Sequence, residues 1–412
     1  MQIIHTLITF IVLLGLSWLI SEKRKQVNIK LIALGILWQI IFALILLKVP
    51  AVTDGLMYIN RGLQVIAEST TKASAVVFGN LAAPSENSKI GFILALQGLP
   101  ILIVISALSS LLIYLRILPA IINLLSIFFR KTLSIGGTMG VAVSANIFTG
   151  MSETPLIITP YLSHLTRSEL FSLMVCGTSC IASSVMVLLS MIIQPIVPNA
   201  IVHIISAVLL SIPGALTVSR IMVPESKKES YTEGTHADFS ECNSMIDAIF
   251  SGIISGAKVV IMIVAMLIGF VALIDVLNQL LSLFPDIGGM PISLQRILGL
   301  IMLPISWLIG IPVNEAQIVS TLLGTKIAFN EIIAFQEMVN IGSSLSENTK
   351  IMTIYAICSF ANLGSIGIMV GIYEALVPHR RAEVMSLGVR SVIAGTITNL
   401  LNASLVGAFL LC

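Results

Sequence analysis

Residues 146–155 read "NIFTGMSETP", which places an amide, hydroxyls, the carboxylate of Glu153, a glycine and a closing proline within ten positions. The remainder of the 412-residue chain is strongly apolar: 57% of all residues are hydrophobic and only 10% are charged. About a quarter of the residues of a soluble domain are charged, so this chain could not cover a soluble surface of its own size. The composition predicts a polytopic integral membrane protein.

Charge and cysteine usage narrow the possibilities further. The net charge of +2 is too small to indicate a nucleic-acid partner. The first twenty residues are apolar and their positive charges follow in "SEKRKQ", the reverse of a secretory signal, so we expect a retained first helix. The five scattered cysteines are interpreted as small buried hydrophobes.

The apolar runs predict about eight transmembrane helices, because a spanning helix needs about 20 apolar residues. The candidate spans are residues 2–20, 29–48, 91–115, 168–193, 195–217, 256–283, 352–375 and 385–411. Residues 50–90 and 116–131 look like helices that lie along the membrane interface. Clusters of Lys and Arg lie in every second loop between the spans. Because basic residues favour cytoplasmic loops, this pattern predicts that both termini lie outside.

Two apolar regions, 134–160 and 292–330, are interrupted midway by glycine, proline and an acid: "TGMSETP" in the first and "IGIPVNEAQ" in the second. Unpaired backbone groups in lipid cost several kcal/mol each, so a through-going helix is a poor interpretation. We expect two re-entrant hairpins. Each is followed by a span with small polar residues midway, "SCIASS" and "SFANLGS", which indicates inverted repeats and a secondary transporter with a midplane site.

Glu153 and Glu315 fall at the two expected hairpin turns, and an acid at membrane depth is a functional candidate. The alternative is that both turns reach the interface and leave the acids solvated. Asn362 and Ser365 share a helix face and could bind a hydroxyl-rich solute together with Glu315, or could simply pack helices. Phe360 could offer a ring for stacking, although a single phenylalanine in an apolar span is more often plain packing.

Three motifs together resemble the concentrative nucleoside transporter family in a bacterial member: "SANIFTGMSETPLIITPYL", "GIPVNEA" and "ICSFANLGSIGIMVGI". The resemblance covers the chain from about residue 90 to its end. It implies a homotrimer in which a transport domain moves as an elevator and carries a nucleoside with a coupling cation. The implied scaffold comprises residues 1–133 and 218–290, and the transport domain comprises residues 134–217 and 291–412.

The resemblance also implies roles for individual positions. The implied ribose-binding residues are Glu315, Asn362 and Ser365. The turn that reads the nucleobase would comprise Met151, Ser152 and Glu153, with Val185 beside it. The implied sodium site comprises Asn146, the backbone at Thr149, and the backbone at Cys180 and Ile181.

Two positions depart from the family pattern. Met151 stands where glutamine is usual, and a thioether cannot donate to a base edge or accept well from it, so we expect base selectivity to be shifted or broad. Cys180 stands where serine is common, and soft sulfur suits sodium poorly. The coupling ion is therefore open between Na⁺ and H⁺, with a slight preference for a proton carried by Glu153.

Other functional classes lack support in the sequence. An intramembrane protease would need a serine–histidine pair, paired aspartates or an HExxH helix, and none of these motifs is present. A channel would need a continuous polar pore, whereas the polar breaks of this sequence are confined to two places. The remaining alternative is a transporter of another polar solute, such as a nucleobase or a sugar. The sequence thus predicts a nucleoside:cation symporter of the bacterial inner membrane that is not an enzyme and has no cofactor beyond its coupling cation.

Overall fold

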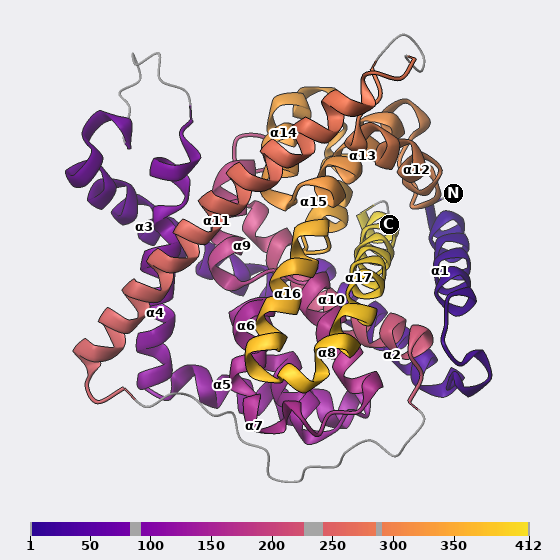
Figure 1. Ribbon diagram of the computed structural model, residues 1–412, viewed down its shortest axis with the longest axis horizontal. Helices are drawn as coiled ribbons and strands as arrows, with labels where there is room; N and C mark the ends of the chain where they lie inside the picture. The colour runs from indigo at the N-terminus through magenta and orange to yellow at the C-terminus, as the bar shows by residue number, and fades with distance from the viewer. Residues whose placement is uncertain (1, 83–91, 226–241, 286–290, 411–412) are drawn as a thin grey trace.

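The structure, a computed structural model, describes residues 2–82, 92–225, 242–285 and 291–410 (Figure 1). These residues form helices without any strand, which confirms the all-α membrane class. Six of the helices are long and apolar enough to cross a membrane. Residue 91 of the third expected span, most of the loop 224–246 and residue 411 of the last span lie outside the described residues.

The helices of the first half of the chain are α1 (Gln2–Leu19), α2 (Ile29–Lys48), α3 (Pro50–Phe78), α4 (Pro100–Tyr114), α5 (Ile117–Leu133), α6 (Gly137–Ile157), α7 (Thr159–Leu162), α8 (Arg167–Ser179) and α9 (Ser183–Ile193). Those of the second half are α10 (Ala200–Met222), α11 (Met245–Leu281), α12 (Leu294–Leu308), α13 (Val313–Ala328), α14 (Glu331–Ile341), α15 (Glu347–Ile357), α16 (Leu363–Leu376) and α17 (Arg381–Leu410). A helix or a pair of helices lies at each expected span. The fourth and seventh spans are interrupted, between α8 and α9 and between α15 and α16.

The first expected hairpin is α6, which reverses at Gly150, a residue with φ 74° and ψ −172° inside the helix. The hydroxyl of Thr154 donates to the side-chain oxygen of Asn146 at 3.3 Å. Residues eight apart in a straight helix are separated by about 12 Å, so this contact requires the chain to turn back. The limb before Gly150 is about 20 Å long, shorter than the hydrocarbon core of about 30 Å.

The second reversal toward the interior lies at a different place from the one expected. The interruption at "IGIPVNEAQ" exists, with Gly310 at φ 101° and Pro312 before α13, but it joins α12 to α13. A further reversal at 329–330 joins α13 to α14, with Asn330 as the N-cap of α14. The hairpin that mirrors α6 is therefore α13–α14, and α12 is the counterpart of α5, the helix that precedes the first hairpin.

The two repeats share one order of elements: a preceding helix, a hairpin, an interrupted helix and a long helix. Cys180 caps the C-terminal end of α8, and Cys358 caps that of α15. The backbone N–H of Phe360 donates to the carbonyl of Cys180 at 3.3 Å, so the two interruptions touch. Both repeats thus bring their interruptions to one place in the interior.

Helices α1 and α2 are fastened to the long helices of the repeats. The hydroxyl of Thr6 donates to the carbonyl of Ser404 at 2.9 Å, which joins α1 to α17. The amide of Gln39 donates to the side chain of Asn402 at 2.6 Å, which joins α2 to α17. Both bonds are buried, so α1 and α2 pack as part of the same body as α17.

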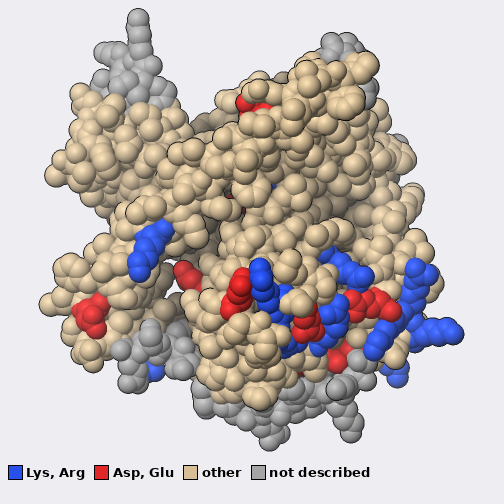
Figure 2. Space-filling view, in the orientation of Figure 1, with Lys and Arg blue, Asp and Glu red and all other residues tan. Residues whose placement is uncertain are grey.

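Charged side chains gather on one side of the molecule. Figure 2 shows most of the basic and acidic residues of this face in its lower half. Glu22, in the loop after α1, pairs with Arg167 of α8 at 2.7 Å and with Arg390 of α17 at 2.6 Å. The hydrogen bond from Arg167 holds the pKa of the Glu22 carboxyl below its usual range. This cluster is a second link between α1 and the repeats.

Helices α4 and α11 pack closely on each other, and α11 runs diagonally across the front of Figure 1. Gly252 and Gly256 of α11 lie so close to the backbone of α4 that a Cβ atom would be 2.6 Å from the Cα atoms of Ala107 and Ile103. Small residues that allow such an approach are typical of helix contacts in membranes. The cavity described below lies between this pair and the hairpins.

The reversal at Gly150 gives a stability prediction. Alanine at this position would adopt a backbone conformation open essentially only to glycine, and its Cβ would lie 2.7 Å from that of Ala182. We expect Gly150→Ala to lower the free energy of unfolding by about 1–3 kcal/mol. The matched control is Gly371→Ala, because no heavy atom lies within 4 Å of a Cβ there. Thermal unfolding of both purified variants checks this; equal midpoints would contradict the tight contact.

Candidate functional site

A cavity of about 130 Å³ lies where the two hairpin tips and the two helix interruptions meet α11. Each tip and each interruption contributes side chains, and α11 forms the remaining wall. The lining residues are Thr149, Met151, Ser152, Glu153, Ala182, Ser184, Val185, Val259, Met262, Ile263, Met266, Phe270, Phe329, Asn330, Glu331, Ile332, Phe360, Asn362, Gly364, Ser365 and Ile368.

A chain of hydrogen bonds runs along one side of this cavity. Asn362 is the N-cap of α16, and its side-chain oxygen accepts from the backbone N–H and the hydroxyl of Ser365 at 2.9 and 3.1 Å. Its amide nitrogen donates to the carboxylate of Glu331 at 3.2 Å. The chain joins the tip of the second hairpin to the start of α16. It presents an acid, an amide and a hydroxyl to one solute, as expected for Asn362 and Ser365.

Glu315, the acid expected at this place, does not line the cavity. It lies in the first turn of α13, at the end of that helix away from the tip. Its carboxylate accepts from the backbone N–H and the hydroxyl of Ser346, at 3.1 and 3.0 Å. Glu315 therefore holds the start of α15 against α13. Glu331, which the sequence reading missed, occupies the position in the cavity instead.

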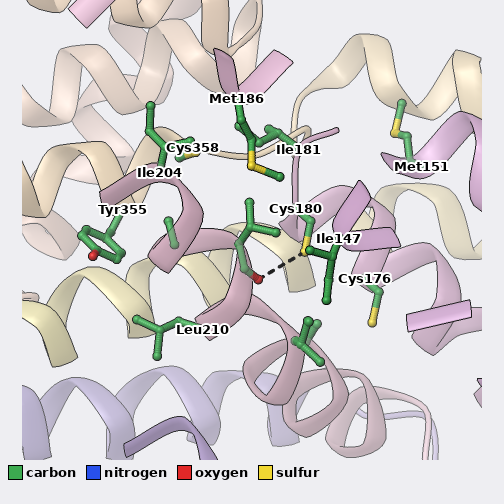
Figure 3. Packing of buried hydrophobic residues seen from close by; sticks show 14 of the residues in the cluster. Ile147, Met151, Cys176, Cys180, Ile181, Met186, Ile204, Leu210, Tyr355 and Cys358 are labelled. Atoms are coloured by element: carbon green, nitrogen blue, oxygen red, sulfur yellow. Dashed lines mark hydrogen bonds between the residues drawn. The ribbon is translucent and has the colours of Figure 1, made fainter. Parts of the chain in front are cut away.

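The opposite side of the cavity is formed by the tip of the first hairpin, as expected for Met151, Ser152 and Glu153. The side chain of Glu153 is accessible from the cavity and has no hydrogen-bond or ion-pair partner among the residues that the structure describes. Met151 is 7% exposed and sits at the edge of the apolar cluster in Figure 3. The two acids of the cavity thus differ: Glu331 is held by neighbours and Glu153 is free.

Much of the cavity wall is apolar. Helix α11 contributes Met262, Met266 and Phe270, and the break in the fourth span contributes Val185. Phe360 lies at the other interruption, also against the cavity. An apolar wall with a few convergent polar groups is typical of small-molecule sites. This cavity suits a solute with a flat apolar part and several hydroxyls.

The four residues of the expected sodium site lie beside the cavity, where α6 packs against the break after α8. Asn146 donates to the carbonyl of Cys176 at 2.9 Å, and the hydroxyl of Thr149 lies 3.0 Å from that of Thr154. The tip and the break are joined by the hydroxyl of Ser183, which donates to the carbonyl of Phe148 at 2.7 Å. The side-chain oxygen of Asn146 accepts from Thr154, and the carbonyl of Cys180 accepts from Phe360, so a hard cation at this place would share or displace these hydrogen bonds.

The thiol of Cys180 lies within hydrogen-bonding reach of the side chain of Asn146. It donates to the carbonyl of Val208 in α10 at 3.8 Å, within the apolar cluster of Figure 3. Ile181 is fully buried next to it. The serine-to-cysteine departure therefore places a soft sulfur beside Asn146 where a serine would place a hydroxyl oxygen.

The position of Glu331 carries a signal that sequence reading could have used. Glu153 precedes Cys180 by 27 residues, and Glu331 precedes Cys358 by the same 27 residues. The two cysteines end α8 and α15, so the two acids occupy equivalent places in the repeats. Glu315 has no acid at the equivalent place in the first repeat, because that position is Gly137.

Comparisons with known proteins agree with this arrangement. Three family models match: the Na⁺ dependent nucleoside transporter N-terminus over residues 8–81, nucleoside recognition over 95–196, and the Na⁺ dependent nucleoside transporter C-terminus over 203–407. The nucleoside permease NupC of Helicobacter pylori is 30% identical, over 97% of this chain and 96% of that protein.

Solved structures of the protein CNTnw are also similar. Its inward-facing substrate-bound state is 32% identical, with a TM-score of 0.89 over 99% of both chains. An outward-facing state of a CNTnw variant is 31% identical, with a TM-score of 0.89 over 99% of this chain and 98% of that chain. The similarity thus extends along the whole chain in sequence and in fold, and the protein is a member of the concentrative nucleoside transporter family.

Proposed function

We propose that this protein imports nucleosides by symport with a cation, and that the body containing both hairpins carries the two across the membrane. The observation that carries the proposal is the cavity itself, in which Glu331, Asn362 and Ser365 face Glu153 across a partly apolar space. The family models and the relative from Helicobacter pylori support a nucleoside as the solute.

In this proposal the sugar binds at the chain Glu331–Asn362–Ser365. A carboxylate accepts from hydroxyl groups in strong, charge-assisted hydrogen bonds, and two neighbouring ribose hydroxyls suit its two oxygens. The base then lies against the first hairpin tip and the apolar wall of α11. Met151 and Ser152 border this end, so the base contacts one thioether and one hydroxyl where a glutamine would supply both a donor and an acceptor.

We place the coupling cation at or beside Glu153. This carboxylate has no partner among the described residues, so a proton on it, or a sodium ion near it, would neutralise an otherwise unbalanced charge. The oxygens around Asn146 and Thr149 are the neighbouring group that could hold sodium. The descriptions of the family models favour sodium, whereas the loss of a serine oxygen at position 180 favours the proton.

The division into a moving and a fixed body follows the contacts. The α4–α11 pair meets the site mainly through apolar side chains of α11, which suits a surface along which the site slides. Hydrogen bonds from Thr6 and Gln39 tie α1 and α2 to α17. We therefore assign α1 and α2 to the moving body, in contrast to the division expected from the resemblance, which placed residues 1–133 in the scaffold.

The charge distribution supports the expected orientation. The cluster around Glu22 and Arg167 lies on the side opposite the start of α1 and the end of α17 in Figure 1. Basic residues favour the cytoplasmic side, so both termini would face outward from a bacterial inner membrane. The homotrimer stays a prediction from the family resemblance.

The acid that binds the sugar can be tested with a matched pair of substitutions. We expect Glu331→Gln to raise the KM for uridine by about tenfold or more, because a charged acceptor is replaced by a neutral one. Glu315→Gln should keep the KM, since its amide oxygen can still accept from Ser346. Uptake of labelled uridine into proteoliposomes measures both. A raised KM only in Glu315→Gln would reverse the assignment.

Base preference tests the other end of the cavity. We expect Met151→Gln to change the ratio of uptake between nucleosides by about two- to tenfold, because one neutral hydrogen bond to the base edge is gained. Met151→Leu should leave the ratio unchanged. Competition of uridine uptake by other nucleosides, free bases and sugars measures this. Stronger competition by bases or sugars than by nucleosides would favour the alternative solute.

Imposed gradients identify the ion. We expect an inward gradient of one cation, sodium or proton, to accelerate uridine uptake by proteoliposomes, and Glu153→Gln to remove that acceleration because the unbalanced carboxylate is lost. If sodium is the ion, Asn146→Ala should raise the sodium concentration needed for half-maximal uptake. Uptake that responds to neither gradient would rule out the symport.

A further inference from the structure

A lysine is buried next to the second hairpin tip. Lys326, in the last turn of α13, is 0% exposed, and its Nζ atom makes no hydrogen bond within the described part of the chain. A buried ammonium without a partner is among the costliest features a protein interior can hold. It does not line the cavity, so neither the solute nor the expected sodium site accounts for it.

The groups around Lys326 identify its counter-charge. Lys326 ends α13 and Glu331 begins α14, so the hairpin tip brings the two buried groups near each other, and Cys358 is the other titratable group near Lys326. Glu331 is itself buried, with Lys326 as the cation that acts on it. On α12, the adjoining helix, Arg296 directs its guanidinium to the carbonyl of Pro291. Glu331 is therefore the acid that balances this lysine.

Other charged groups near Glu331 are few. Glu337 of the same helix is half-buried and interacts with Thr325. Helix α9, which also packs on α14, has no charged residue, and Lys350 at the far end of α15 pairs with Glu347 at 2.7 Å. Glu153 also lines the cavity, on the first hairpin tip. Lys326 is thus the cation that can offset the burial of Glu331.

We propose that Lys326 is the buried counter-cation of Glu331 and a positioning residue for substrate binding, because it keeps this carboxylate ionised and in place to accept from the sugar hydroxyls. This inference rests on the proposed role of Glu331. A carboxylate in low-dielectric surroundings takes up a proton when its counter-charge is removed. The protonated acid loses the charge that makes it a strong acceptor, so the affinity for substrate falls.

The consequence is a pH dependence that a purely structural lysine would not produce. In Lys326→Met, Glu331 is protonated at neutral pH, and uridine should bind about tenfold more weakly than to the unaltered protein. As the pH rises to about 9, Glu331 ionises and the ratio of the two affinities should approach one. Lys326→Arg keeps the charge and should show a ratio that is constant with pH.

Equilibrium binding of labelled uridine to purified protein, at a fixed sodium concentration and from about pH 6 to pH 9, measures this ratio. Because both proteins contain Glu153, its own titration cancels in the ratio. A carboxylic-acid band in infrared spectra of Lys326→Met that is absent from the double variant Lys326→Met/Glu331→Gln would show directly that Glu331 carries the proton. An equal loss of affinity at every pH, or no loss, would overturn the proposal.

A second measurement needs no substrate. Thermal unfolding of Lys326→Met, Glu331→Gln and the double variant forms a cycle. We expect the loss of stability in the double variant to be smaller than the sum of the losses in the two single variants, because removing both charges leaves neither unbalanced. Additive losses would mean that the charges are not coupled. If this cycle shows coupling but uridine does not bind the unaltered protein, the proposed function fails and the coupling between Lys326 and Glu331 stands.

Discussion

The site depends on two helix interruptions that lie against each other in the interior. An interrupted helix leaves N–H and carbonyl groups unpaired, and in a bilayer each such group costs several kcal/mol. Here Phe360 donates from one interruption to the carbonyl of Cys180 in the other. The amide of Asn399 in α17 donates to the carbonyls of Tyr355 and Cys358, and Asn362 caps α16. Polar side chains are therefore required there by the backbone, and a polar solute can use the same groups.

The sequence was sufficient for the all-α membrane class, for a helix at each expected span and for the first hairpin. Span positions follow from length and apolarity alone, and at the first tip Gly150, Pro155 and an acid fall within a few residues. The second tip was predicted at the wrong place because the strongest turn signals, Gly310 and Pro312, mark the loop between α12 and α13. The tip itself turns at Phe329–Asn330 without glycine or proline, and a side-chain cap replaces them.

The acid of the second tip could still have been located by comparing the repeats. Their letters differ, but the spacing of 27 residues from acid to capping cysteine is common to both. The directions of individual side chains could not be predicted in this way. That the thiol of Cys180 points to Val208, or that Lys326 is enclosed without a hydrogen bond, depends on neighbours more than 25 positions away or in other helices. Periodicity in one segment carries no information on such contacts.

The two acids of the cavity, Glu331 and Glu153, differ in whether a neighbouring cation balances their charge. If Lys326 balances Glu331, the one unbalanced charge among the described residues that line the cavity is that of Glu153, since a nucleoside is neutral. Movement of that charge past the apolar side chains of α11 is unfavourable, because a lone charge in low-dielectric surroundings is poorly solvated. One monovalent cation at Glu153 makes the loaded site neutral, whether it is bound as a proton or as sodium. In the proposed mechanism the two acids therefore have different tasks: Glu331 would hold the solute, and Glu153 would make its movement conditional on the ion.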